Sequence, residues 1–221
     1  LHSTSRRQRQ MCIRDRNMSI EEITDYCKNP TSKKFLQIAD MKETEIDLAI
    51  KRLKRTKKIL ETKKEQLSIC EKLQGQEIRI EQCKAERISV LPYDFLDDDV
   101  FEIFDYLRDK WSIEQIRMGI GSFISLDKVI SKDFSKYDGI YTYTLGDTSG
   151  SKTFVRPKGK YLCGYQQGTW DKAPDMYEKM IDYADQNNLV LTGYAYEIGL
   201  NEFAFSSPEE YVTKFMIQIA G

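Results

Sequence analysis

The chain has 221 residues, which suffice for one ordinary domain with an appendage or for two small domains. With 40% hydrophobic and 31% charged residues it has the composition of a soluble globular protein, because a disordered chain lacks the apolar surface that offsets ordering entropy. The longest uncharged apolar runs fall far short of the roughly 20 residues that a membrane-spanning helix needs, so the sequence predicts no such helix.

Residues 1–16 differ from the rest of the chain. They show no apolar periodicity and no signal- or transit-peptide pattern, and they resemble translated cloning adapter, so we expect an adapter-derived or disordered segment. Their five arginines against Asp15 give a net charge of +4, which turns the formal −1 of the whole chain into −5 for the remainder. The only histidine, His2, lies here too, so the remainder cannot form histidine-dependent triads or histidine metal sites.

The five cysteines are an odd number, widely spaced and without a CxxC pair. This pattern suggests neither a disulfide framework nor a zinc site. Three consecutive aspartates at positions 97–99 are expected to cap a helix rather than to bind a metal. We therefore expect reduced thiols in a cytoplasmic protein, with no metal and no cofactor.

Two helices are predicted after the first segment. The first begins at Ser19, with Glu22 three residues on as in a capping box, and ends before Pro30. The second covers residues 31 or 32 to 74 and is closed by Gly75, which can adopt the left-handed conformation that ends helices.

The second helix carries an apolar residue at every seventh position. These residues are Ile46, Leu53, Leu60 and Leu67. A helix cannot bury such a stripe by itself, so the pattern predicts a homodimer in which the same helix of a second subunit covers it. The basic run at residues 51–58 is interpreted as a solvent-exposed helix face. The net charge of −5 on the remainder of the chain disfavours binding to the phosphate groups of nucleic acid.

After Gly75 the hydrophobic spacing changes from helical to alternating. In chain order we expect strands at 77–82 and 87–91, a helix at 97–110, strands at 120–126 and 139–145, a loop at 146–160, a strand at 161–166, a helix at 174–186 and strands at 190–200 and 212–219. Both sides of the loop thus give strand, helix, strand, strand, with corresponding elements roughly 73 residues apart. A duplicated unit is predicted, forming an antiparallel sheet with helices on one face and a cleft along a pseudo-two-fold axis.

Several segments resemble a known family of regulators. Residues 18–23 (MSIEEI) and the heptad helix after them are similar to the segment that follows the winged helix-turn-helix in MerR-family regulators, where it leads into an antiparallel coiled coil. The sequences QEIRIE (76–81), GTWD (168–171), GYAYEIGLNE (193–202) and PEEYVT (208–213) resemble the GyrI-like effector domain of multidrug sensors in that family.

The resemblance covers residues 17–221 and implies an α+β fold, with a long dimerising coiled-coil helix followed by a GyrI-like domain. We expect a helical linker and dimerisation helix at 17–75 and a ligand-binding domain at 76–221. The implied function is the ligand-sensing and dimerisation portion of a MerR-type transcription regulator that binds a small lipophilic cationic or aromatic effector. It is expected to contact DNA only through an N-terminal domain that is missing from this sequence.

Two residues depart from the family pattern. Gln166 stands where a histidine is common ahead of Gly168, and Lys214 stands where an acidic residue often follows Thr213. Because enzymatic variants of this fold resemble hydrolases that depend on acidic and aromatic cleft residues, both departures argue against an enzyme.

A candidate ligand site follows from the strand at 190–200. Alternation places Ala195, Glu197 and Gly199 on one face, and the two small residues leave room beside the carboxylate. A carboxylate away from water needs a partner, so such a recess favours a lipophilic cation. In the family resemblance, Glu197 stands where the drug-binding glutamate is expected. The aromatic residues expected to line the same cleft are Tyr141, Tyr143, Tyr161, Tyr165 and Trp170.

Alternatives remain at this point. Glu197 could point to solvent. For each aromatic residue taken alone core packing is the favoured interpretation, and only their clustering argues for a site. A small hydrolase with Glu197 as general base and a tyrosine as acid is the second functional hypothesis, and a stand-alone drug- or toxin-binding protein is the third.

Overall fold

The structure, a computed structural model, describes residues 19–73, 75–93, 106–145 and 152–221. The described residues fall into two compact units, divided between Lys57 and Lys58, and each is described by itself. The predicted adapter-derived segment 1–16 lies outside the described residues. In the ranges given above, no helix is both long and apolar enough to cross a membrane.

The N-terminal unit contains helix α2 (Ile20–Lys28) and the first part of helix α3 (Ser32–Cys70). The capping box predicted at the start of α2 is confirmed: Ser19 Oγ accepts from the Glu22 N–H at 3.2 Å, and Glu22 Oε2 accepts from the Ser19 N–H at 2.7 Å. Thr31 Oγ1 accepts from the Lys34 N–H at 3.2 Å and so caps α3. Both helix starts therefore follow from side-chain capping that the sequence displays.

Helix α3 ends four residues earlier than predicted. It was expected to reach residue 74 but ends at Cys70. The Lys72 and Leu73 N–H groups both bond to the Ile69 carbonyl at 3.1 Å, which tightens the last turn. Ile69, Cys70 and Leu73 pack on the sheet, and this contact fixes the direction of the chain before Gly75, whose φ is +78°.

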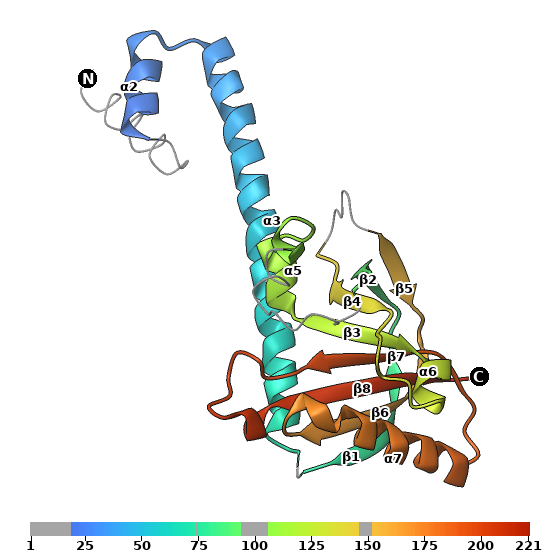
Figure 1. Cartoon of the computed structure of the whole chain (residues 1–221). Coiled ribbons are helices and arrows are strands. Elements are labelled where there is room, and N and C mark those ends of the chain that lie inside the picture. Colours follow the sequence, from blue (N-terminus) through green and yellow to red (C-terminus); the bar gives the residue numbers. More distant parts are fainter. Residues whose placement is uncertain (1–18, 74, 94–105, 146–151) are drawn as a thin grey trace. The chain divides into compact units, whose positions relative to one another are not determined.

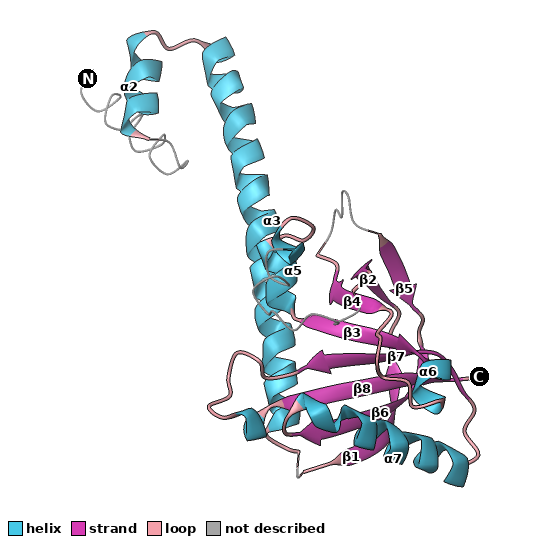
Figure 2. Ribbon diagram, in the orientation of Figure 1, coloured by secondary structure: helices cyan, strands magenta, loops and turns pink. Residues whose placement is uncertain are grey.

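The C-terminal unit is built on one sheet of eight strands with short helices around it (Figures 1 and 2). The strands are β1 (Glu77–Cys83), β2 (Glu86–Leu91), β3 (Ile120–Ser125), β4 (Gly139–Tyr143), β5 (Thr153–Arg156), β6 (Gly159–Gln167), β7 (Leu191–Gly199) and β8 (Val212–Ile219). The helices are α5 (Ile113–Met118), α6 (Leu126–Ile130) and α7 (Ala173–Gln186), with 3-10 turns η1 (Trp170–Lys172) and η2 (Pro208–Glu210). This arrangement confirms the predicted α+β class.

The strand order is β1-β6-β8-β7-β3-β4-β2-β5, and neighbouring strands pair antiparallel. The order is symmetric about the β7–β3 pair, since β8 and β4 come next on the two sides, then β6 and β2, then β1 and β5. This is the arrangement expected from two copies of a strand-helix-strand-strand unit. The two copies meet at β7 and β3, so residues on these strands occupy the centre of the sheet.

Several elements of the C-terminal unit were not predicted from the local hydrophobic pattern of the sequence. The predicted loop at 146–160 contains strand β5 and the start of β6, because Thr153–Arg156 finds a partner in β2. Helices α5 and α6 were not predicted, although Ser112 and Gln115 form a capping box at the start of α5. Of the helix predicted at 97–110, residues 106–108 are helical and most of the remainder lies outside the described residues.

The sheet buries different side chains on its two faces, as alternation requires. On the α7 face, residues of α6 and α7 pack on Ile124, Leu162, Ala195, Phe215 and Ile217. On the α3 face, residues 69, 70 and 73 pack on a cluster that contains Tyr141, Tyr161, Cys163, Tyr165, Tyr196, Ile198 and Met216. We use the names α7 face and α3 face below.

Candidate functional site

Glu197 lies at the centre of the sheet on the α7 face. It stands on β7, with Ser122 of β3 opposite it on one side and Phe215 of β8 on the other. Only 1% of its surface is exposed. The expectation that it could point to solvent is therefore wrong, and the site is a buried carboxylate.

Four neutral donors surround this carboxylate. Oε1 accepts from the Tyr177 hydroxyl at 2.6 Å and from the Tyr137 hydroxyl at 2.8 Å. Oε2 accepts from the Trp170 Nε1–H at 3.1 Å and from the Ser122 hydroxyl at 3.2 Å. A carboxylate has about four lone-pair positions, so its capacity to accept hydrogen bonds is filled.

Helix α7 positions Tyr177. Its buried residues Met176, Tyr177, Met180 and Ala184 recur at helical spacing and form the face that packs on the sheet. The Tyr177 ring stacks on Phe134 at 5.6 Å and meets Phe215 edge-on at 5.2 Å. Both contacts fix the ring with its hydroxyl aimed at Glu197.

A glycine allows α7 to approach the sheet closely. A Cβ at Gly164 of β6 would lie 2.8 Å from the Met176 sulfur and 2.7 Å from the Met180 sulfur. A larger side chain there would have to displace the side chains of Met176 and Met180. The glycine therefore lets the buried face of α7 pack directly on β6.

The electrostatics of the site differ from those of an ordinary surface glutamate. Burial raises the pKa of Glu197, while the hydrogen bonds from Tyr177, Tyr137 and the other two donors oppose the rise. Burial, together with the charge on Glu197, also raises the pKa of both tyrosine hydroxyls. No ion pair reaches Glu197 from the described part of the chain.

The small residues beside Glu197 leave less room than the sequence suggested. Ala195 is fully buried in the core of the α7 face. A Cβ at Gly199 would lie 2.0 Å from the Tyr211 hydroxyl oxygen, so this tyrosine fills the space that the glycine leaves. Burial raises the pKa of Tyr211 to about 12. A ligand that lies beside Glu197 would therefore have to displace a side chain.

The sheet separates the predicted aromatic residues from Glu197. Trp170 is on the Glu197 side, as expected. The four tyrosines expected in the same cleft, Tyr141, Tyr143, Tyr161 and Tyr165, belong to or pack against the cluster on the α3 face. The ring of Tyr141 lies 5.7 Å from that of Tyr196, which alternates with Glu197 along β7. The structure thus does not form the single cleft that was predicted for all of them.

Three residues of the Glu197 site were missed. Tyr177 could have been found, because it lies on the inner face of the predicted helix at 174–186. Ser122 required knowledge of which β3 residue lies opposite Glu197, and Tyr137 lies between α6 and β4, where no periodicity identifies it. Whether the predicted and the missed residues bind a ligand stays a prediction.

The α3 face holds a group of partly buried charges. Glu81 accepts from Arg79 at 2.6 Å, from the Tyr165 hydroxyl at 2.6 Å and from Lys214 at 2.7 Å. Burial by itself would raise the pKa of Glu81, but these donors, Lys214 foremost, lower it to about 2. Lys214, a departure from the family pattern, is thus one half of an internal ion pair.

The described residues contain one group with metal-ligand spacing. The Cys83 and Cys163 sulfurs and a Glu81 carboxylate oxygen lie within 4.8 Å of one another. Because Glu81 already accepts from two cations and a tyrosine, its oxygens are not available to a metal ion. We do not assign a metal to this group.

The fold and the buried carboxylate define a class of protein: a duplicated α+β domain with a preformed polar centre under a helix. Residues 123–220 match the GyrI-like family, described as a small molecule binding domain. The chain is 23% identical to the multidrug-efflux transporter 2 regulator of Bacillus subtilis strain 168, over 94% of this chain and 77% of that protein.

One solved structure with a TM-score above 0.5 has a similar fold. EcmrR in its DNA complex is 12% identical with a TM-score of 0.53, covering 96% of this chain and 81% of that chain. The EcmrR C-terminal domain is 8% identical with a TM-score of 0.49, covering 66% of this chain and 98% of that one. The comparisons therefore give a GyrI-like match at residues 123–220 and a similarity in fold to EcmrR over most of the chain.

Proposed function

We propose that this chain is the sensing part of a transcription regulator and that Glu197 binds a lipophilic cation without N–H donors, such as a quaternary ammonium or phosphonium ion. One observation carries the proposal: a buried carboxylate accepts four hydrogen bonds from neutral groups and has no ion-pair partner in the described part of the chain. The four donors satisfy its lone pairs but leave its negative charge in place.

The filled lone pairs select the kind of cation. A primary ammonium is strongly hydrated and would find no acceptor on Glu197 for its N–H groups. A quaternary cation has no N–H group and loses little hydration. At 4 Å and an effective dielectric constant of ~20, its attraction to the carboxylate is about 4 kcal/mol before its desolvation is subtracted.

Trp170 is the proposed entry point. Its side chain is 48% exposed, which makes it the most exposed of the four donors, and its indole N–H bonds directly to Glu197. If the indole turns outward, Oε2 loses one neutral donor and the ring face becomes available to the incoming cation. Cation–π contact with Trp contributes roughly 0.5 to 2 kcal/mol.

Titration calorimetry with methyltriphenylphosphonium tests this function. Glu197→Gln removes the charge, and we expect its affinity for the phosphonium to be at least about tenfold lower, equivalent to 1.4 kcal/mol. Glu209→Gln is the matched control, because it removes one negative charge from the surface of η2 and should leave the affinity unchanged. Equal affinities in the wild-type protein and Glu197→Gln contradict the proposal.

The proposal of a homodimer rests on apolar residues that lie on two opposite sides of α3. Ile69 packs on the sheet and follows Leu60 by nine residues, which at about 100° per residue puts the two on opposite sides of the helix. Leu60 and Leu53 are 61% and 68% exposed. We infer that a second copy of α3 covers them and that ligand binding at the sheet shifts the arrangement of the two helices.

Light scattering at micromolar concentration tests the dimer. The double variant Leu53→Lys with Leu60→Lys should convert the dimer to a monomer, because it places two cations per chain in an apolar seam. Leu48→Lys makes the same chemical change at a position that is 63% exposed and off the seam, and it should stay dimeric. If the wild-type protein is a monomer, the proposed helix–helix interface is contradicted.

Ligand binding is favoured over the hydrolase alternative. A general base must accept a proton from water or substrate, and all four acceptor positions of Glu197 are filled. We therefore expect no Glu197-dependent turnover of p-nitrophenyl esters. Hydrolysis that disappears in Glu197→Gln would favour the enzyme. A stand-alone drug-binding protein would bind the phosphonium equally but remain without effect on transcription once joined to a DNA-binding domain.

A further inference from the structure

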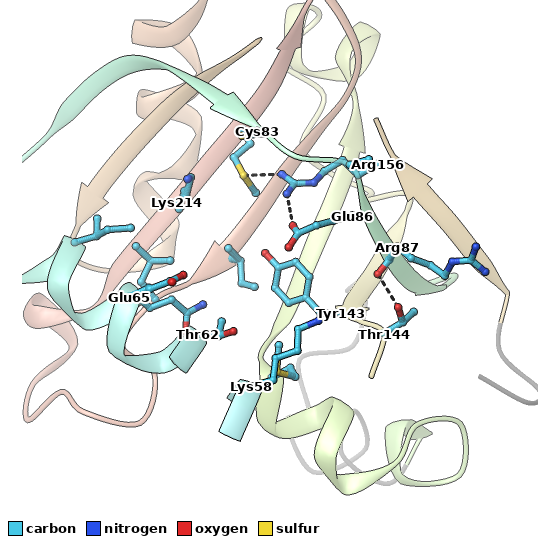
Figure 3. Close-up of a pocket in the computed structure, with 17 residues that line it drawn as sticks. Lys58, Thr62, Glu65, Cys83, Glu86, Arg87, Tyr143, Thr144, Arg156 and Lys214 are labelled. Carbon is cyan, nitrogen blue, oxygen red and sulfur yellow. Dashed lines mark hydrogen bonds and ion pairs between the residues drawn. The ribbon is translucent and has the colours of Figure 1, made fainter. Parts of the chain in front are cut away.

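A cavity of about 430 Å³ lies on the α3 face, between the last turns of α3 and the sheet. Figure 3 shows side chains from the helix, including Thr62, and from the strands, including Cys83, Arg156 and Lys214, around the same hollow. All of these residues belong to the unit 58–221. The cavity is on the opposite side of the sheet from Glu197 and is not explained by the function proposed above.

One wall of the cavity carries a thiol in unusual surroundings. Cys83 lines the cavity, and its sulfur lies within 4.8 Å of the sulfur of Cys163, which is fully buried on β6. The Cys163 thiol donates to the Cys83 sulfur, and this bond, assisted by Lys214 and Arg156 against the effect of burial, lowers the pKa of Cys83 to about 7. Two cations and a buried donor thus stabilise a thiolate at a solvent-connected cavity.

The cavity wall also contains polar atoms without partners. Arg156 is 4% exposed; its terminal nitrogens reach Glu86 at 2.5 Å and the Met216 sulfur at 2.9 Å, but its Nε–H donates to nothing in the described residues. The Oε1 atom of Gln66, a residue 7% exposed on α3, likewise has no donor there. A buried donor left unpaired costs roughly 1–3 kcal/mol, so a ligand oxygen that reaches Arg156 would be stabilised.

We propose that this cavity captures small α,β-unsaturated carbonyl compounds at Cys83. The thiolate attacks the β-carbon, so a C–S bond forms and the C=C π pair moves to the carbonyl oxygen as an enolate. The enolate then takes one proton from water, which gives a saturated thioether with no net oxidation. Arg156 and Lys214 stabilise the negative charge while it is on oxygen, and Ile69 and Met216 contact the apolar part of the compound.

The expected rate advantage is moderate. About half of Cys83 is thiolate at pH 7, against a few per cent for an ordinary cysteine with a pKa of about 8.5. A thiolate of lower pKa is also a weaker nucleophile, with a Brønsted slope of about 0.4–0.5. The two effects together leave Cys83 several-fold faster than an exposed cysteine.

Peptide mass spectrometry of the native full chain after brief treatment with N-ethylmaleimide tests the proposal. Cys27, which is exposed in the N-terminal unit, is the internal reference. We expect Cys83 to react at least about threefold faster than Cys27 at pH 7, and its rate to rise with a midpoint near pH 7. A rate at or below that of Cys27, or a midpoint above pH 8, overturns the proposal.

Two variants separate the cavity from the thiol. Thr62→Trp fills the hollow from the helix side and should slow Cys83 at least about tenfold while Cys27 is unchanged. Cys163→Ala removes the donor and should move the midpoint for Cys83 upward. If neither variant changes Cys83 relative to Cys27, the proposal fails. Glu197→Gln should leave Cys83 rates unchanged, so failure here is distinguishable from failure of the cation site.

Discussion

On the α3 face of the sheet, charged side chains have partners of opposite sign: Glu81 accepts from Lys214 and Arg79, and Arg156 donates to Glu86. On the α7 face, Glu197 is held by two tyrosines, a tryptophan and a serine, all of them neutral. The pKa of Glu81 falls to about 2, whereas the pKa of Glu197 rises. The charges described on one face are paired within the chain, whereas the other face holds a buried carboxylate that has no ion-pair partner among the described residues.

The largest loss of stability is expected when the ion pair between Lys214 and Glu81 on the α3 face is removed. Lys214→Met leaves Glu81 partly buried with only Arg79 and Tyr165 as donors, so the free energy of unfolding should fall by about 3 kcal/mol. Urea denaturation measures this change. The double variant with Glu81→Gln should recover at least half of the loss, since it also removes the carboxylate that has lost one of its two cations. If Lys214→Met unfolds at the same urea concentration as the wild type, the ion pair contributes nothing.

A smaller loss of stability is expected when one of the neutral hydrogen-bond donors to Glu197 on the α7 face is removed. Tyr177→Phe deletes one hydrogen bond to Glu197 and should lower the free energy of unfolding by about 2 kcal/mol. It also opens one acceptor position, so the affinity for a primary amine such as phenethylamine should increase relative to that for methyltriphenylphosphonium. Tyr183→Phe, on the same helix, is the control and should change neither quantity. An unchanged preference would show that filled lone pairs do not select the cation.

Glu81 should make the free energy of unfolding depend on pH in the acid range. The pKa of Glu81 is about 2 in the folded protein, below its ordinary value of 4.5, so its stabilisation is complete above pH 4.5 and is lost as the pH falls toward 2. Allowing for its remaining solvent contact, the wild type should lose about 1 kcal/mol more than Glu81→Gln over this range. Urea denaturation at several pH values measures the difference, and parallel pH profiles would contradict it.

The smallest effect is expected at the proposed entry point. Trp170→Phe keeps a ring but removes the N–H donor to Glu197. Because the side chain is 48% exposed and water can replace the donor, the free energy of unfolding should change by less than about 1 kcal/mol. A loss above 2 kcal/mol would mean that Trp170 is a fixed part of the core and not a cover that can turn outward.

The sequence predicted well what depends on short-range pattern. The capping box at Ser19, strand β8 and the placement of Ala195, Glu197 and Gly199 on one face all follow from local spacing. The irregularity in β7 lies between Thr192 and Ala195, upstream of these residues, so it does not disturb their alternation. The family resemblance then supplied the role expected for Glu197.

What could not be predicted depends on strand register. Nothing in the sequence shows that Tyr141 lies opposite Gly121, and this pairing puts the tyrosine on the α3 face, away from Glu197. Tyr137 reaches the site from a connection without periodicity. Strand β5 was missed because four residues after a segment rich in Gly, Ser and Thr form a strand only through pairing with β2.

We propose above all that Glu197 recognises the positive charge of a ligand rather than the shape of its apolar groups. Methyltriphenylphosphonium and triphenylphosphine oxide share three phenyl rings on phosphorus and differ mainly in charge, so calorimetric titration of the unaltered protein with both isolates the electrostatic contribution. The account predicts that the phosphonium binds at least about 30-fold more tightly, equivalent to about 2 kcal/mol. Equal affinities for the two compounds would contradict it.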